Sequence, residues 1–458
     1  MGISLYNRPF VSSAFGSLRR AAIERPWLFV VVAHGVQLLV LMWIAAHATF
    51  CCDASNYYLP AGHSLIHDGL LWQDRGAGYR FYLTPLTLGL LEKLAEMASV
   101  SPASIPVAIP FLLASCFFVT SSIASGFVLR RDGMRKWFWF AIPVFLNPLA
   151  LSIAPYPIQE SVVAIFGLPL LVVLLAHRFD NAIWRCVVGA ALVSTTIAAR
   201  STLVWLLVPV AVYVAQETLR QNITRKDVMK ALAAAFAVMA ILLAPQAYIN
   251  WNTFHSFTPT TATKFGDEQI GYGIGTLNYS TVENHGIYGP LPVPSPYTSL
   301  SSAEKTSEFY VAHPVEGFFL VLVHTWSAFN YVAFVPYIPR SAIGLVTPAL
   351  IVSALTVAIG LLGLFQHLRT PPNINLAIFL ILTVALSCAY VALSATENRF
   401  GLFGFVALSL SAWQLLASAE GRRLCISCAP IVIAYIFLCV VINRLLFYRT
   451  SLFWPNAG

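Results

Sequence analysis

This chain contains few charged residues. Only 10% of its 458 residues are Asp, Glu, Lys or Arg, whereas 58% are apolar. Soluble globular domains carry about 25% charged residues, so this chain has too little polar side chain to coat a water-exposed globule. The scarcity argues against a soluble enzyme, a disordered chain and a nucleic-acid-binding module. The eight cysteines are scattered, mostly in apolar runs, and their spacing does not indicate a disulfide framework.

Long apolar runs take the place of the missing charge. A transmembrane helix needs about 20 mostly apolar residues, and eleven stretches approach or exceed that length. They cover residues 27–50, 103–128, 137–155, 160–177, 184–199, 201–216, 231–249, 341–366, 374–394, 401–418 and 424–446. The sequence therefore predicts an all-α polytopic membrane protein with about eleven transmembrane helices, forming a single domain over residues 1–458.

Two further apolar stretches, 81–98 and 315–337, contain more polar residues than the others. The first contains Glu92 and Lys93, and the second contains His324 and ends in a proline-rich segment. We expect both to form helices that lie along the membrane surface. They fall within the two long connections of the chain, residues 51–102 and about 250–340.

The distribution of charge predicts the side on which these connections lie. If the N-terminus is cytoplasmic and both doubtful stretches are surface helices, 17 Lys and Arg residues fall in inside loops and eight in outside loops. This bias agrees with the positive-inside rule. Thirteen of the nineteen acids then lie outside. Both long loops are predicted to be extracytoplasmic, and chemistry is expected where the chain spends its non-spanning residues.

Asp53 stands just beyond the first apolar run, at the start of the first long loop. Tyr57, Ala61 and Leu65 follow it at helical spacing, which predicts a short amphipathic surface helix. A carboxylate at a membrane boundary can take a proton from an acceptor hydroxyl. The alternatives are that Asp53 is a solvated loop acid or that it caps the helix that follows it.

Four further charged residues fall at the same predicted membrane face. Glu160 opens an apolar helix, where a first-turn acid also favours the helix dipole. Arg200 lies between two spans, where it could bind a phosphate through paired hydrogen bonds or extend toward lipid headgroups. Glu397 and Arg399 share a short turn between two later spans, and solvated loop charges are the alternative there.

His63 and His67 lie four residues apart on the predicted surface helix, a spacing that suits two metal ligands on one helical face. The sequence offers no clear third ligand. Polarity at an interface is therefore the favoured interpretation of this pair.

The order of these motifs is itself informative. In chain order they are Asp53 followed by Tyr57, Ala61 and Leu65; Asn147 with Pro148; Gln159, Glu160 and Ser161; Arg200 with Ser201; the stretch 245–259; His313, Pro314 and Glu316 leading to Trp326; and Glu397, Arg399 and Phe400. This order and spacing resembles the GT-C glycosyltransferases. The resemblance is to the branch with bacterial aminoarabinose transferases and dolichyl-phosphate-mannose protein mannosyltransferases, and it covers about residues 27–418.

The resemblance implies a sugar transfer from a polyprenyl-phosphate donor to an acceptor, usually with inversion. It implies that Asp53 is the general base and that Glu160 is a second catalytic carboxylate that positions the acceptor or a metal. Arg200 and Arg399 are then candidates for binding the donor phosphate. If the enzyme uses a divalent metal such as magnesium or manganese, Asp53 and Glu160 are its expected ligands.

Two residues beside this set, Tyr57 and Glu397, are expected to position donor or acceptor. The acceptor is expected to be a glycan, lipid or protein, with a cell-surface glycan such as lipopolysaccharide preferred. The expected location is the bacterial inner membrane, with the active site facing the periplasm and a role in cell envelope biogenesis.

Two other functions compete with glycosyl transfer. A transporter or flippase usually buries ionisable groups near mid-membrane, but no Asp, Glu, Lys or Arg falls near the middle of a predicted span. An O-antigen polymerase or ligase usually relies on arginines in its large outer loop, and residues 250–340 contain only Lys264, Lys305 and Arg340 as basic residues.

Overall fold

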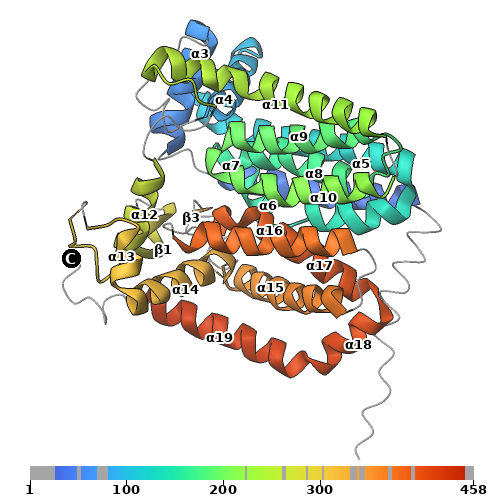
Figure 1. Ribbon diagram of the computed structural model, residues 1–458. Helices are drawn as coiled ribbons and strands as arrows, with labels where there is room; N and C mark the ends of the chain where they lie inside the picture. The colour runs from blue at the N-terminus through green and yellow to red at the C-terminus, as the bar shows by residue number, and fades with distance from the viewer. Residues whose placement is uncertain are drawn as a thin grey trace, which may run out of the picture.

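The computed structural model describes residues 26–48, 53–69, 81–221, 224–259, 265–284, 287–301, 304–330, 338–339, 346–369, 374–393 and 398–448. Within these residues, nine helices are long and apolar enough to cross a membrane, or ten if the bent pair Ala419–Ser427 and Ala429–Ile442 forms one span. The long helices lie roughly side by side across the molecule (Figure 1). The prediction of an all-α polytopic membrane protein is confirmed.

The spanning region consists of helices whose bounds follow in chain order. They are α2 (Pro26–His47), α5 (Ile105–Phe145), α6 (Pro148–Ile153), α7 (Gln159–Val162), η5 (Val163–Gly167), α8 (Leu168–Ala176), α9 (Ala182–Ala199), η6 (Ser201–Leu206), α10 (Leu207–Leu219), α11 (Arg225–Phe254), α15 (Val346–Arg369), α16 (Ile374–Ala392), η8 (Asn398–Gly401), α17 (Leu402–Ala417), α18 (Ala419–Ser427) and α19 (Ala429–Tyr448).

The count differs from the expected eleven mainly because two predicted runs, 103–128 and 137–155, are counted together as α5, which a kink at Gly133 divides into two helices. Gly133 interrupts this helix with φ 78° and ψ 175°, a backbone conformation that glycine tolerates and other residues rarely adopt. Beside the bend, an Asp132 carboxylate oxygen lies 2.8 Å from the ring nitrogen Nδ1 of His177. The other Asp132 oxygen accepts a 3.0 Å hydrogen bond from the backbone N–H of Arg178. The bend is therefore held against the end of α8.

Exposed apolar side chains on several spanning helices face away from the protein. Trp27, Phe236, Ile241 and Ile431 are between 68% and 74% exposed. In a spanning helix such side chains contact lipid tails, where their exposure carries no hydrophobic cost.

Small residues allow α15 and α17 to pack closely. A Cβ atom on Gly360 would lie 2.7 Å from the carbonyl oxygen of Leu408, and one on Gly363 would lie 2.5 Å from that of Ser411. Helices within membranes gain stability from such close backbone approach.

The two long loops form shorter elements that gather at one end of the helices. These elements are η1 (Ala54–Tyr58), α3 (Leu59–Asp68), α4 (Leu83–Met97), η4 (Pro102–Ser104), α12 (Phe265–Gly275), β1 (Thr276–Asn284), β2 (Ile287–Pro294), α13 (Glu308–Ala312), α14 (Pro314–Asn330) and β3 (Ile338–Pro339). We call this the outer end, because the charge distribution predicts that it faces away from the cytoplasm. Helices α3, α4, α12 and α13 all lie at the left in Figure 1.

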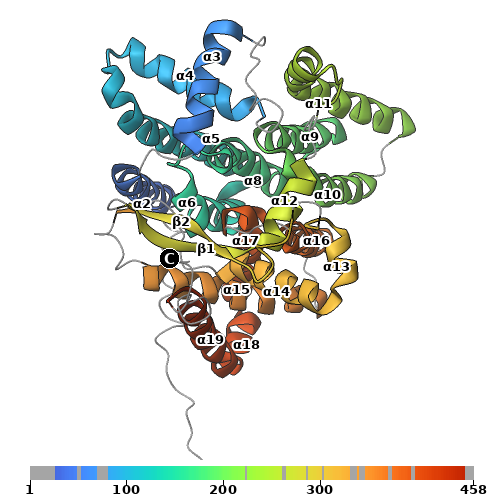
Figure 2. The ribbon, with the colours of Figure 1, turned by 90° about the vertical axis from the view of Figure 1, so that its left-hand side faces the viewer.

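Helices α4 and α14 correspond to the two predicted surface helices. At 15 and 17 residues, each is shorter than a typical transmembrane span. The small sheet was not predicted: β1 pairs with β2 and β2 with β3, all antiparallel. In Figure 2, which looks onto the outer end, β1, β2 and α12 cross between α3 and α4 on one side and α13 and α14 on the other.

The surface helix after Asp53 forms as predicted, but its buried face differs by one residue at the start. Tyr58 is 3% exposed, whereas Tyr57 is 44% exposed. Ala61 and Leu65 are buried as expected. The reason is that η1 is a π-helical turn, whose hydrogen bonds span one more residue than those of an α-helix, so the side chains that precede α3 are rotated.

The orientation of the chain gives a first testable prediction. A reporter fused after Lys226, in the first turn of α11, is expected to be cytoplasmic, and one fused after Leu300 extracytoplasmic. Paired phosphatase and fluorescent-protein fusions measure this directly. The reverse pattern would place the outer end in the cytoplasm and remove the basis for the function proposed below.

Candidate functional site

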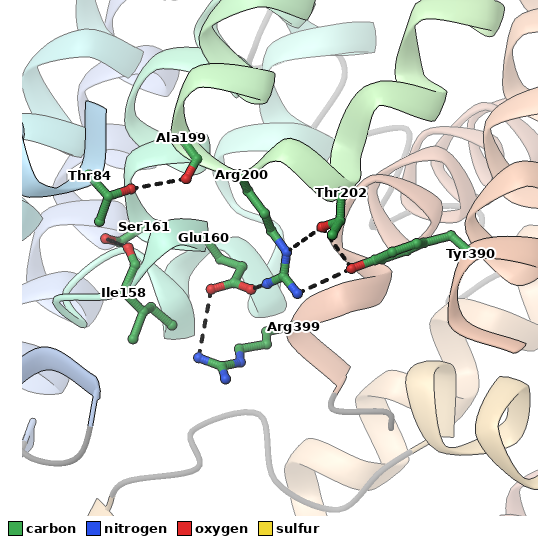
Figure 3. A network of polar contacts seen from close by, with 9 residues as sticks. All are labelled: Thr84, Ile158, Glu160, Ser161, Ala199, Arg200, Thr202, Tyr390 and Arg399. Carbon is green, nitrogen blue, oxygen red and sulfur yellow. Dashed lines mark hydrogen bonds and ion pairs between the residues drawn. The ribbon is translucent and has the colours of Figure 1, made fainter. Parts of the chain in front are cut away.

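Three charged side chains meet at the outer end of the helix bundle. Glu160 forms an ion pair with Arg200 through Oε1 and Nη1. Its other oxygen, Oε2, lies 3.7 Å from Nη1 of Arg399. One carboxylate therefore faces two guanidinium groups (Figure 3). We call Glu160, Arg200 and Arg399 the outer cluster.

Each member of the outer cluster lies where a helix begins or ends. Glu160 is in the first turn of α7, and the next residue, Ser161, donates a 2.7 Å hydrogen bond to the carbonyl oxygen of Ile158 just before that turn. Arg200 is the extended residue between α9 and η6, with φ −150° and ψ 104°. Arg399 lies in η8, between α16 and α17. The sequence prediction that these three residues occupy one end of the bundle is confirmed.

Polar and aromatic neighbours hold Arg200 from several sides. Its Nε donates to Thr202 Oγ1 at 3.0 Å, and its Nη2 donates to the Tyr390 hydroxyl at 3.2 Å. The Tyr390 hydroxyl in turn donates to Thr202 at 2.9 Å. The guanidinium carbon of Arg200 lies 4.0 Å from the centre of the Phe400 ring, and that of Arg399 lies 5.4 Å from it. Both are cation–π contacts, which gain strength when water is excluded.

The outer cluster is buried despite its charge. Glu160 is 3% exposed and Arg200 is 8% exposed. Removing ions from water is costly unless opposite charges and hydrogen bonds compensate, so the three side chains depend on one another. Among these three residues, two positive charges face one negative charge.

The first long loop is attached beside Arg200. At the start of α4, Thr84 donates a 3.2 Å hydrogen bond to the carbonyl oxygen of Ala199, the residue before Arg200. The backbone N–H of Tyr82 donates to Oε1 of Gln246 in α11 at 2.9 Å. These contacts place the base of the first loop against the outer ends of α9 and α11.

Asp53 lies at the start of the same loop and is partly buried. Its side chain makes no capping hydrogen bond to η1, and its backbone is already helical, so the capping alternative is wrong. Helix α4 packs against η1 and α3 on one side and against α7 and α9 on the other. Asp53 and the outer cluster thus belong to elements that share α4 as a neighbour. Glu397, the remaining predicted site residue, lies outside the described residues.

The second long loop is attached near Tyr390. The His324 ring in α14 is fully buried, with Nδ1 2.9 Å from the carbonyl oxygen of Ala392 and Nε2 3.0 Å from that of Thr276. Ala392 ends α16 only two residues beyond Tyr390. His324 therefore joins the start of β1 to the helix end that helps to hold Arg200.

Sequence reasoning did not identify Tyr390 and Thr202 as part of this site. Tyr390 is a polar aromatic in the last turn of an otherwise apolar helix, and Thr202 follows Arg200 by two residues, but neither signal is specific. Gln246 and Asn250 were also missed. They are buried, one turn apart on α11, and joined by a 3.0 Å hydrogen bond.

The outer cluster is poorly suited to a metal ion. The Glu160 carboxylate faces two guanidinium groups, which repel a cation, so the expectation that Glu160 binds a metal receives no support from its surroundings. A different group of potential ligands lies in the first loop: His63, Glu92 and Glu96.

Comparison with known proteins adds no further constraint. No protein-family model matches the chain, and the search of curated proteins finds no significant match.

Proposed function

We propose that this protein is a membrane glycosyltransferase that moves a sugar from a polyprenyl-phosphate donor to a glycan or lipid acceptor at the periplasmic face of a bacterial inner membrane. The observation that carries the proposal is the outer cluster: two arginines and one carboxylate, buried at the outer ends of the spanning helices and flanked by both long loops. A lipid-linked substrate would present its phosphate at this depth.

In this proposal Arg200 and Arg399 bind the donor phosphate. Guanidinium groups match phosphate oxygens through paired, charge-assisted hydrogen bonds, and the outer cluster holds two of them. Glu160, which the sequence suggested as a catalytic carboxylate, is assigned a positioning role, because its oxygens face both arginines.

Asp53 is assigned the role of general base. The acceptor hydroxyl attacks the anomeric carbon of the sugar and gives its proton to the Asp53 carboxylate. The bond between that carbon and the phosphate oxygen breaks, and polyprenyl phosphate leaves with the bonding electron pair. Attack opposite the leaving phosphate inverts the configuration of the anomeric carbon.

A cavity between α5, α8 and α9 supports a long apolar donor. It has a volume of about 830 Å³ and is lined mostly by apolar side chains, including Phe127 and Leu170. It extends from His177 to Ile165 and Thr195. Ile165 and Thr195 each lie five residues along the chain from a member of the outer cluster, which is about 7.5 Å along an α-helix. An isoprenoid chain in this cavity would lie below a phosphate held by the arginines.

Surface glycans provide the test of this proposal. Mass spectrometry of glycans from deletion cells is expected to show the loss of one sugar, which wild-type protein restores.

Arg399→Gln is expected to lower transfer about 10- to 100-fold, because a hydrogen bond to a charged group contributes about 1.5–3 kcal/mol. Arg399→Lys keeps the charge but loses the paired geometry, so its activity should be intermediate.

Lys230→Gln is the matched control, because it removes a positive charge from the exposed first turns of α11 at the opposite end of the bundle. The glycans of cells with Lys230→Gln should be those of the wild type.

Purified protein supplied with a synthetic polyprenyl-phosphate sugar and an acceptor separates transfer from transport, since a flippase forms no new glycosidic bond. Unchanged glycans in the deletion cells would contradict the proposal.

A further inference from the structure

Helices α3 and α4 approach each other unusually closely through two glycines. A Cβ atom on Gly62 would lie 2.4 Å from the carbonyl oxygen of Pro85, and one on Gly89 would lie 2.3 Å from that of Gly62. Any larger residue at either position would force the two helices apart. This contact places side chains from both helices within reach of one another.

Potential metal ligands stand directly beside the glycine contact. His63 follows Gly62 on α3, and Glu92 and Glu96 lie one and two turns beyond Gly89 on α4. His63 Nδ1 is 3.4 Å from Glu92 Oε1. One ligand atom from each of His63, Glu92 and Glu96 lies within 4.8 Å of the other two.

His67 adds a fourth side chain on the same face of α3. Its ring contacts that of His63 at a tilt of 48°, with 4.3 Å between the ring centres. The two histidines are four residues apart on one helix, and the two glutamates are four residues apart on the other. Glu92 and Glu96 are thus the third and fourth potential ligands, which the sequence alone did not reveal for the histidine pair.

The donor set determines the kind of ion. Two imidazole nitrogens and two carboxylates suit Zn²⁺, which binds both ligand types at about 2.0–2.2 Å in tetrahedral geometry. Ligands at that distance are roughly 3.3–3.6 Å apart by the same geometry, so only small side-chain rotations would close the group around an ion. Imidazole ligands disfavour magnesium and calcium, which prefer oxygen alone.

One group opposes metal binding. Lys93 Nζ lies 3.0 Å from Glu96 Oε2, and this hydrogen bond lowers the pKa of the Glu96 carboxyl. Lys93 therefore has to move aside before Glu96 can bind an ion.

We propose that His63, Glu92 and Glu96, with His67 as the fourth ligand, form a site for a zinc-like divalent cation that clamps α3 to α4. Because α4 is attached to the end of α9 through Thr84 and packs against η1, the clamp would stiffen the loop that begins with Asp53. Zinc binding at this site does not require that the protein be a glycosyltransferase.

Zinc binding to the purified full-length protein in detergent tests the site. With ZnCl₂ as the probe, titration calorimetry and elemental analysis should give one bound ion per chain and a raised melting temperature. His63→Ala and Glu92→Gln are each expected to weaken binding at least tenfold. Lys93→Gln should tighten it severalfold, because the competing cation is gone. Affinity should also fall on acidification, since histidine binds metals only when deprotonated.

His313→Ala is the matched control, because His313 is an exposed histidine of the second long loop and should leave zinc affinity unchanged. The melting temperatures of all variants without zinc establish that each is folded. Equal zinc binding by the wild type and the His63→Ala, Glu92→Gln double variant would overturn the site. An unchanged affinity in Lys93→Gln, together with normal binding by both single variants, would do the same.

Discussion

Glu160→Gln is expected to destabilise the protein by about 3–5 kcal/mol, the usual cost of removing one partner from a buried ion pair. The carboxylate is the shared counter-ion of Arg200 and Arg399. Glutamine keeps the shape and one hydrogen-bond acceptor, but it leaves two guanidinium groups facing each other without a negative charge between them. The apparent melting temperature in detergent, at a fixed heating rate, measures the effect.

A second substitution makes this prediction specific to charge. Arg399→Gln in the Glu160→Gln background removes one of the two guanidinium groups that residue 160 faces, so the double variant should be more stable than Glu160→Gln alone. Such non-additivity is expected of residues in one electrostatic network. Glu308→Gln, an exposed acid in the first turn of α13, is the control and should change stability by less than about 0.5 kcal/mol. Equal stabilities of the single and double variants would contradict the interdependence of the cluster.

The membrane class of the fold was predictable because it depends on local composition. Each long apolar run imposes a helix on its own, and the basic residues between runs set the orientation. The same reasoning predicted that Glu160, Arg200 and Arg399 lie at one end of the bundle. It could not reveal that they touch, since their pairing depends on how α7, α9 and η8 pack together.

The parts that escaped prediction depend on contacts between distant segments. Tyr390 bonds to Arg200 across 190 residues of sequence, and no local pattern indicates this. By sequence alone, Glu92 and Glu96 are ordinary charges on a surface helix. The contact between Gly62 and Gly89 places Glu92 and Glu96 beside His63. The π-helical turn of η1 places Tyr58 rather than Tyr57 on the buried face, because hydrogen bonds that span one more residue change the helical phase.

Glu160 shows how one location can fit two different roles. An acid in the first turn of a helix at the outer membrane boundary fits a catalytic carboxylate as well as it fits a structural one. The surroundings separate the two roles. A carboxylate that faces two guanidinium groups is held in place by them, which supports a positioning role for Glu160 and leaves base catalysis with Asp53.

Asp53→Asn is expected to lower sugar transfer about 100- to 10,000-fold, the range by which a positioned general base accelerates proton transfer. Asparagine is nearly the same size but does not accept a proton at neutral pH. The melting temperature and the amount of protein in the membrane, measured beside transfer, separate loss of the base from loss of folded protein. Transfer in membranes with the natural donor is the measurement.

Asp53→Glu separates the chemistry of this position from its shape. It retains a carboxylate on a longer side chain, so it should recover part of the activity that asparagine loses, with a pH dependence like that of the wild type. Near-normal transfer by Asp53→Asn would exclude Asp53 as the base. Loss of transfer in proportion to loss of folded protein would reassign it to structure, the outcome expected for Glu160→Gln. The two variants thus distinguish a residue that takes part in the reaction from one that holds its neighbours in place.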